Sequence, residues 1–120
     1  NIYNALKPKG KLILTTLNAL YPLSHSLEDF YKENGVDIRE HHFDLLTLRE
    51  TSTDTITDDS GQQRVIKCSE RFYMPSEIAW YLHSLHFTGI GIYSCKLGAF
   101  SRDESLTRDD FEMLVVAEKA

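Results

Sequence analysis

The side chains best suited to metal chemistry in this sequence are its histidines, and two pairs of them are closely spaced. His41 and His42 are adjacent. Adjacent residues of a strand point to opposite faces, so these two imidazoles do not easily share one ion, and no carboxylate or cysteine stands at ligand spacing. His83 and His86 are three residues apart and could share a helix face. Because they flank a leucine-rich stripe, we expect an interfacial or solvent-facing role for them, and no metal site.

The two cysteines, Cys68 and Cys95, have no Cys-x-x-Cys spacing and no companions of the kind a metal site needs. We expect them to be reduced thiols carried on strands, in a protein of the cytoplasm.

Asn18 and Tyr21 are the first candidates for substrate binding. They belong to the segment 18–23, which follows an apolar run and is expected to be a loop. In open α/β sheets ligands bind beyond the carboxyl ends of the strands, so we expect these two side chains to line a pocket there. The same residues allow another interpretation, in which Asn18 ends the strand with an Asx-type turn and Tyr21 packs under the next helix.

The apolar run that positions them follows a turn. Pro8 and Gly10 break the chain, and three apolar residues then follow without alternation, at 12–14. This pattern predicts a strand over 11–16 that is buried on both faces. Residues 2–6 are typical of the last turns of a helix, so helix, tight turn and strand form the second half of a βαβ unit.

Two helices and a hairpin are expected further on. The segment 26–34 predicts a short helix, capped by Ser24 or Ser26, with Gly35 following its end. β-prone runs on either side of a turn cluster at Gly61 predict a β-hairpin over about 47–73. Its arms are mostly polar, so it is expected to project as a ribbon.

The best-defined helix is predicted over 75–85, where Pro75 suits the first helical position. Strands are predicted over 89–97 and 111–117. The loop between them, 98–110, holds no long helix, so these strands are expected to be antiparallel. Its charged residues, Asp110 among them, are expected to be solvated.

Composition excludes some classes of partner. The chain has 120 residues and a net charge of −5, which argues against nucleic acid as the main partner because phosphate contacts need clustered Lys and Arg. No apolar run approaches the roughly 18 residues of a membrane span, so no membrane partner is expected.

Three segments together resemble the class I S-adenosylmethionine-dependent methyltransferases. Leu-Lys-Pro-Lys-Gly-Lys-Leu, at 6–12, with Thr-x-Asn at 16–18, is similar to the turn and fifth strand of that family. Arg-Phe-Tyr-Met-Pro-Ser-Glu, at 71–77, with His-Phe at 86–87, resembles its passage through the last helix, although Met74 stands where the family often has Thr and His86 where it usually has Gly. The segment 111–119 resembles its final strand.

The resemblance implies an α/β fold: the C-terminal part of a Rossmann-like methyltransferase fold, as one partial domain over 1–120. It implies a three-stranded mixed sheet in the order first-last-middle, two to three helices and the inserted hairpin. The family's Gly-rich loop and its acidic ribose-binding residue lie upstream of the fifth strand, and no such loop occurs here. S-adenosylmethionine is therefore expected to bind the parent enzyme and not this chain alone.

The resemblance also places the hairpin toward the methyl acceptor, which makes Arg71 and Tyr73 candidate pocket residues beside Asn18 and Tyr21. The alternative is an Arg71 that pairs with a surface carboxylate and a Tyr73 that fills the core. No catalytic residue and no particular acceptor is predicted.

Two other functions are consistent with the sequence. In the family's sheet order the strand over 11–16 has a bare apolar edge when the fourth strand is missing, so the chain could serve as an assembly domain. It would then form a homodimer, through this edge or by exchange of hairpins. A small-molecule-binding α+β domain unrelated to methyl transfer would gain support if strand 111–117 lay elsewhere than beside strand 11–16.

Overall fold

The computed structural model describes residues 1–37, 39–96 and 98–120. Ile38 and Leu97, and with Leu97 the end of the strand predicted over 89–97, lie outside the described residues. The chain divides into two compact units, the first formed by Asn1–His25 and Tyr73–Ala120 and the second by Ser26–Phe72. Within the described residues, four helices accompany two three-stranded antiparallel sheets, so the expected α/β composition is confirmed.

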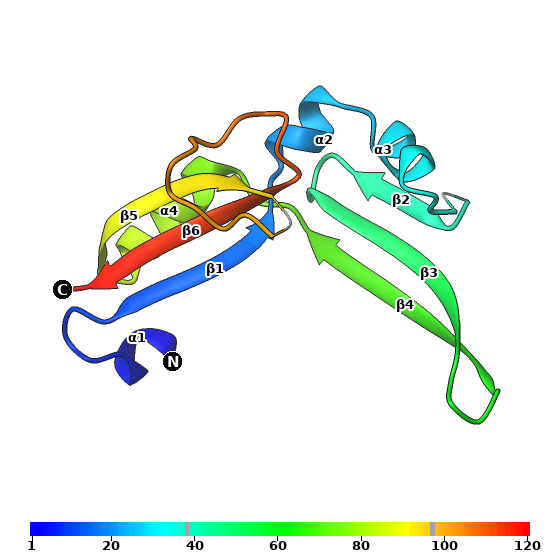
Figure 1. Ribbon diagram of the computed structural model, residues 1–120, viewed down its shortest axis with the longest axis horizontal. Coiled ribbons are helices and arrows are strands. Elements are labelled where there is room, and N and C mark those ends of the chain that lie inside the picture. Colours follow the sequence, from blue (N-terminus) through cyan, green and yellow to red (C-terminus); the bar gives the residue numbers. More distant parts are fainter. Residues whose placement is uncertain (38, 97) are drawn as a thin grey trace. The chain divides into compact units, whose positions relative to one another are not determined.

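The sheet of the first unit has the order β1-β6-β5, where β1 is Lys11–Leu17, β6 is Glu112–Lys119 and β5 is Phe87–Cys95 (Figure 1). This is the predicted order first-last-middle. The prediction of a mixed sheet was wrong, because β6 runs antiparallel to both neighbours and so separates the two strands that run in the same direction. The β5–β6 pairing contains an irregularity between Thr88 and Gly91.

β1 is buried on one face only, which corrects the prediction of burial on both. Leu12 and Leu14 pack against the core, whereas Ile13 between them is 63% exposed. The reason is that the core cluster packs against the face of β1 that carries Leu12 and Leu14. The fully or nearly buried members of the core cluster come from the helix α4 (Pro75–Ser84), β5 and β6: Leu82, Phe87, Met113, Val115 and Ala117.

The helices of the first unit are α1 (Ile2–Ala5), α2 (Leu20–Ser24) and α4 (Pro75–Ser84). α4 confirms the predicted helix, with Pro75 in its first turn. α2 was expected to be loop. The amide of Leu20, the first residue of this helix, donates to Asn18 Oδ1 at 3.1 Å. Pro22 lies in the first turn, where no intrahelical N–H bond is required. This added helix also corrects the expectation of two to three helices.

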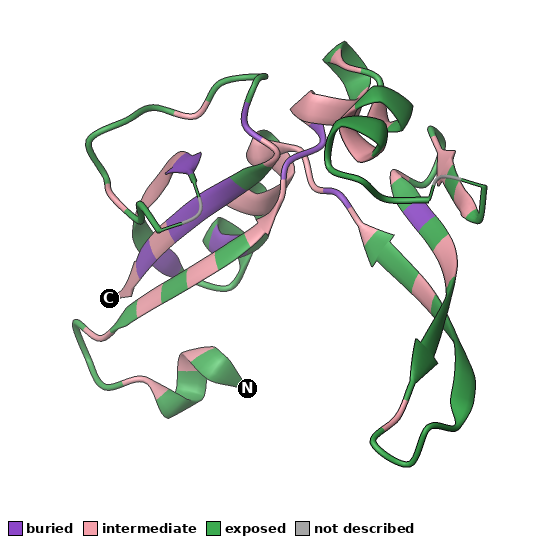
Figure 2. Cartoon of the chain, turned by 45° about the vertical axis from the view of Figure 1, so that its right-hand side comes forward, coloured by how far each residue is buried: buried purple, intermediate pink, exposed green. Residues whose placement is uncertain are grey.

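The second unit consists of α3 (Leu27–Glu33) and the sheet β2-β3-β4, where β2 is His41–Asp44, β3 is Arg49–Thr57 and β4 is Gln63–Arg71. α3 confirms the predicted helix: Ser26 Oγ accepts from the Asp29 amide at 3.2 Å, and Gly35 adopts φ +71° after its end. The hairpin β3–β4 is confirmed, and its turn contains Gly61 at φ +83°. Its arms are largely exposed (Figure 2). The third strand, β2, was not expected in this sheet.

Candidate functional site

Asn18 follows β1 and is fully buried. Its Nδ2 donates to the Asp110 carbonyl at 2.8 Å and to the Thr107 carbonyl at 3.2 Å, while its Oδ1 accepts from Leu20. The side chain therefore fixes the loop that precedes β6 to the end of β1. The Asx-type turn that the sequence allowed is present here.

Asp110 completes this buried polar network, and the prediction that it is solvated was wrong. It is 8% exposed. Its carboxylate accepts from Ser94 Oγ at 2.7 Å and from the Thr107 amide at 2.8 Å. The spacing Thr107-x-x-Asp110, in which each side chain bonds to backbone nearby, is the local signal that could have indicated it.

Tyr73 and Tyr21 lie close to Asn18. The Tyr73 amide donates to the Leu17 carbonyl at 3.0 Å, and the Tyr73 carbonyl accepts from the Ala19 amide at 3.0 Å. The backbone of Tyr73 therefore lies beside the C-terminal end of β1. Its partly buried side chain packs against the core. The Tyr21 amide donates to the Asn18 carbonyl at 3.1 Å. We call Asn18, Tyr21 and Tyr73 the strand-end region.

The Tyr21 ring stacks on His25, with centroids 4.4 Å apart, and meets Phe111 edge-on at 5.4 Å. His25 Nε2 lies 2.9 Å from Asp109 Oδ1. These contacts hold the Tyr21 ring in a defined position next to the loop that Asn18 fixes.

Arg71, the fourth predicted residue, belongs to the second unit. It is the last residue of β4 and pairs across the sheet with Arg49. The structure thus brings three of the four predicted residues together in one unit, and a role for any of them in binding an acceptor stays a prediction.

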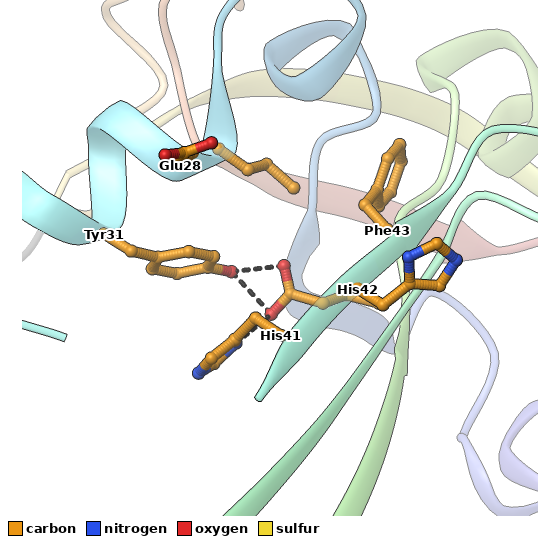
Figure 3. A pocket seen from close by; sticks show the side chains of 7 residues that line it. Glu28, Tyr31, His41, His42 and Phe43 are labelled. Carbon is orange, nitrogen blue, oxygen red and sulfur yellow. Dashed lines mark hydrogen bonds and ion pairs between the residues drawn. The ribbon is translucent and has the colours of Figure 1, made fainter. Parts of the chain in front are cut away.

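A second cluster, which the sequence did not reveal, surrounds Glu50 in the second unit. Glu50 is 5% exposed. The Tyr31 hydroxyl donates to its two carboxylate oxygens, at 2.7 and 2.6 Å, and His41 Nδ1 lies 3.1 Å from Oε1 (Figure 3). Because an ionised carboxylate only accepts hydrogen bonds, the contact with His41 requires a proton on Nδ1.

Burial and charge both act on this cluster. Burial raises the pKa of the Tyr31 phenol, and the hydrogen bond to Glu50 and the negative charges of Glu50 and Glu70 raise it further. The phenol therefore stays a donor across the whole neutral range. His41 Nε2 is buried and has no hydrogen-bond partner among the described residues.

The cluster lines a pocket of about 200 Å³, which we call the Glu50 pocket. Its lining residues are two carboxylates, four rings and one aliphatic side chain: Glu28, Glu50, Tyr31, His41, His42, Phe43 and Leu27. No Lys or Arg is among these lining residues. From the sequence, we considered His41 and His42 only as possible metal ligands. Nothing in the polar sequence of β3 distinguished Glu50 from its exposed neighbours.

In the part of the chain that the structure describes, no three His, Cys, Asp or Glu residues are grouped so that they could hold a metal ion. Among the same residues, no helix has the length and apolar character that crossing a membrane would need.

Comparison with known proteins gives structural matches only. No family model matches the chain, and no curated protein matches it in sequence. The CcbJ methyltransferase from Streptomyces caelestis matches with a TM-score of 0.66 and 13% identity, over 98% of this chain and 50% of that chain. An S-adenosylmethionine-dependent methyltransferase from Clostridium acetobutylicum ATCC 824 matches with a TM-score of 0.64 and 15% identity, over 99% of this chain and 48% of that chain. The chain therefore shares their fold and spans about half their length.

Proposed function

We propose that this chain is the C-terminal, acceptor-side half of an S-adenosylmethionine-dependent methyltransferase. The observation that carries the proposal is the sheet order β1-β6-β5, with β6 antiparallel between its neighbours, in a fold that two methyltransferases share over nearly the whole chain. The same order also argues against an unrelated α+β binding domain, because the last strand lies beside β1.

The residues of this chain do not fit a cofactor site. The sequence has no Gly-rich loop, and both the oxygen and the nitrogen of the buried Asn18 side-chain amide already form hydrogen bonds within the chain. We infer that the parent enzyme binds S-adenosylmethionine through residues upstream, and that the cofactor supplies the methyl group when bound there. Residues 1–120 would then form one partial domain of the parent.

The contribution of this chain would be to position the acceptor. Much of the rate of a group transfer comes from holding the reactants in line and close together. In the strand-end region, Asn18 fixes the backbone, while Tyr21 and Tyr73 offer rings for an acceptor wall. We also propose that Arg71, the last residue of β4, contributes a cation to acceptor binding. We name no general base.

Calorimetric titration with S-adenosylhomocysteine tests the proposal. We expect saturable binding by the full parent protein and no heat from the 120-residue chain at protein concentrations that would reveal millimolar affinity. A parent that does not bind the compound would contradict the methyltransferase function. Binding by the chain alone would contradict the division of the site.

The acceptor-side role is tested separately in the parent, with Asn18→Ala and Arg71→Ala. We expect Arg71→Ala to weaken acceptor binding, and Asn18→Ala to lower turnover because the loop before β6 loses its anchor. Glu33→Gln, an exposed change on α3, serves as the control. Normal turnover and acceptor affinity in the parent carrying both changes would refute the assignment.

A second candidate function, assembly, is supported by one feature. Among the described strands β1 pairs only with β6. Its other edge is unpaired up to Leu17, whose carbonyl accepts from Tyr73, and Ile13 on this strand is 63% exposed. Unpaired edges are templates for further strands. The proposed product is a homodimer through the β1 edge, with exchange of the β3–β4 hairpin as the alternative route. A monomeric mass by light scattering at about 100 µM protein would contradict it.

A further inference from the structure

We propose that the Glu50 pocket binds a small organic cation, an amine in its ammonium form. The proposal goes beyond methyl transfer and does not depend on it, because every residue it uses belongs to the second unit. Nothing in the similarity to methyltransferases assigns a ligand to this pocket.

The first argument is charge. Glu50 is 95% buried, as its exposed fraction of 5% shows, and a buried carboxylate is costly unless charge and hydrogen bonds compensate it. Its hydrogen-bonding groups are the Tyr31 phenol and His41 Nδ1, and no Lys or Arg lines the pocket. Glu28 adds a second carboxylate to the lining, which is paired with Lys32 Nζ at 2.8 Å, and Glu70 lies directly opposite Glu50 on the next strand. The charges of Glu50 and Glu70 therefore favour a cation over an anion in the pocket.

The second argument is the nature of the walls. Four of the seven lining residues carry rings, and Tyr31 and His41 lie with their ring centroids 4.8 Å apart (Figure 3). The faces of phenol and phenyl rings, here those of Tyr31 and Phe43, attract ammonium groups, more so when the cation is removed from water. Leu27 and Phe43 give the pocket apolar surface for the carbon part of such a ligand. Rings, apolar surface and a fixed carboxylate together are the chemistry that recognises an amine.

The third argument is size and the exclusion of a metal. A cavity of about 150 Å³ accommodates a benzene ring, so a pocket of about 200 Å³ has room for a ring with an aminomethyl group. A bare divalent ion would need a set of ligands that the described residues do not offer. The ammonium group suits the site better, since it needs one carboxylate and ring faces, not a closed coordination shell.

The direct test is titration of the 120-residue chain with benzylamine, followed by calorimetry and by amide chemical shifts. Benzyl alcohol has nearly the same shape without the charge and is the matched probe. We expect millimolar binding of benzylamine and affinity at least about tenfold lower for benzyl alcohol. The shift changes should be confined to α3, β2 and β3. Equal affinity for the two probes, no binding of benzylamine, or shifts confined to the first unit would each overturn the proposal.

Variants identify the carboxylates responsible. Glu50→Gln should abolish benzylamine binding, and Glu33→Gln, on the same helix as Glu28 but outside the pocket, should leave it unchanged. If Glu50→Gln fails to fold, Glu28→Gln gives the decision. Glu28 is exposed, and its loss removes one carboxylate charge from the pocket lining and leaves the Lys32 ammonium without this partner. We expect about a threefold loss of affinity for Glu28→Gln. A loss as large for Glu33→Gln would show attraction by overall charge and refute a site.

Discussion

The two units of this chain differ in the residues that are buried at the centre of their sheets. In the first, the residues with no exposed surface at the centre of the sheet are apolar, Met113, Val115 and Ala117. In the second, the interior includes a carboxylate, Glu50, bonded to a phenol and near an imidazole. Figure 2 shows the same contrast: buried residues occupy the middle of β6, whereas the arms of the β3–β4 hairpin are largely exposed.

We infer from this difference that folding stability and a defined binding geometry come from different units of the chain. Burial of apolar surface is non-directional and roughly proportional to area, so the first unit gains its stability from many interchangeable contacts. A buried polar cluster contributes little net free energy, yet it holds its side chains in one geometry and leaves them costly to disrupt. We therefore expect the first unit to carry most of the folding free energy and the second to carry a defined binding geometry.

The largest expected effect is that of Met113→Ala. Met113 is fully buried between β1 and β5, so its truncation should leave a cavity and lower the free energy of unfolding by about 2–5 kcal/mol. Ile13→Ala, on the exposed face of the same sheet, should change it by no more than about 0.5 kcal/mol. Urea denaturation monitored by circular dichroism measures both. Equal losses of unfolding free energy in the two variants would mean that the face of β1 that carries Ile13 is also packed.

A smaller effect is expected for Asp110→Ala, which tests the polar network of the first unit. The change leaves Ser94 Oγ and the Thr107 amide without their acceptor, at a cost of about 1–3 kcal/mol. Asp103→Ala, in the same loop but exposed, is the matched control. The same denaturation experiment applies, and hydrogen exchange of the Thr107 amide should accelerate only in the Asp110 variant. An unchanged exchange rate would show that the network is not what fixes the loop.

The sequence was sufficient wherever a local signal decides the structure. Pro75 and the apolar stripe after it predicted α4, Ser26 and Gly35 bounded α3, and Gly61 marked the turn of the hairpin. The order of the first sheet followed from the methyltransferase resemblance, and the antiparallel pairing of its last two strands followed from a connection without a long helix. These features depend on residues close together in the sequence or on a known topology.

The features that the sequence could not predict depend on contacts between residues that are far apart in the chain. Whether Ile13 is covered depends on which elements lie over the sheet, and no periodicity within an apolar run of three residues carries that information. Glu50 is paired with Tyr31 at a separation of 19 residues and lies in a strand otherwise typical of an exposed ribbon. Asn18 was predicted to line a pocket, but its side-chain amide donates hydrogen bonds to the carbonyls of Thr107 and Asp110, which are 89 and 92 residues away in the sequence.

A third prediction concerns variants that replace the polar side chains around Glu50 in the second unit. Tyr31→Phe removes one donor from the buried Glu50 carboxylate and should cost about 1 kcal/mol. The triple change Tyr31→Phe, His41→Leu and Glu50→Leu removes all the partners together and should be nearly neutral in stability, because apolar replacements of similar volume spare the desolvation cost. Benzylamine binding should be lost in the triple variant. A triple variant that is several kcal/mol less stable would show that the cluster itself holds the second unit together.

The smallest effect concerns alkaline pH and the phenol of Tyr31. Its pKa is raised in the folded chain by burial first and by Glu50 next, so the folded state keeps a proton that the unfolded state releases near pH 10. The stabilisation is complete below that pH and is lost as the pH rises above it, because only the unfolded state then gains from ionisation. The free energy of unfolding, measured from about pH 9 to pH 11, should therefore fall more steeply for the wild type than for Tyr31→Phe. Parallel curves for the two proteins would mean that the phenol is not held by Glu50, and that the second unit lacks the ordered polar interior that distinguishes it from the first.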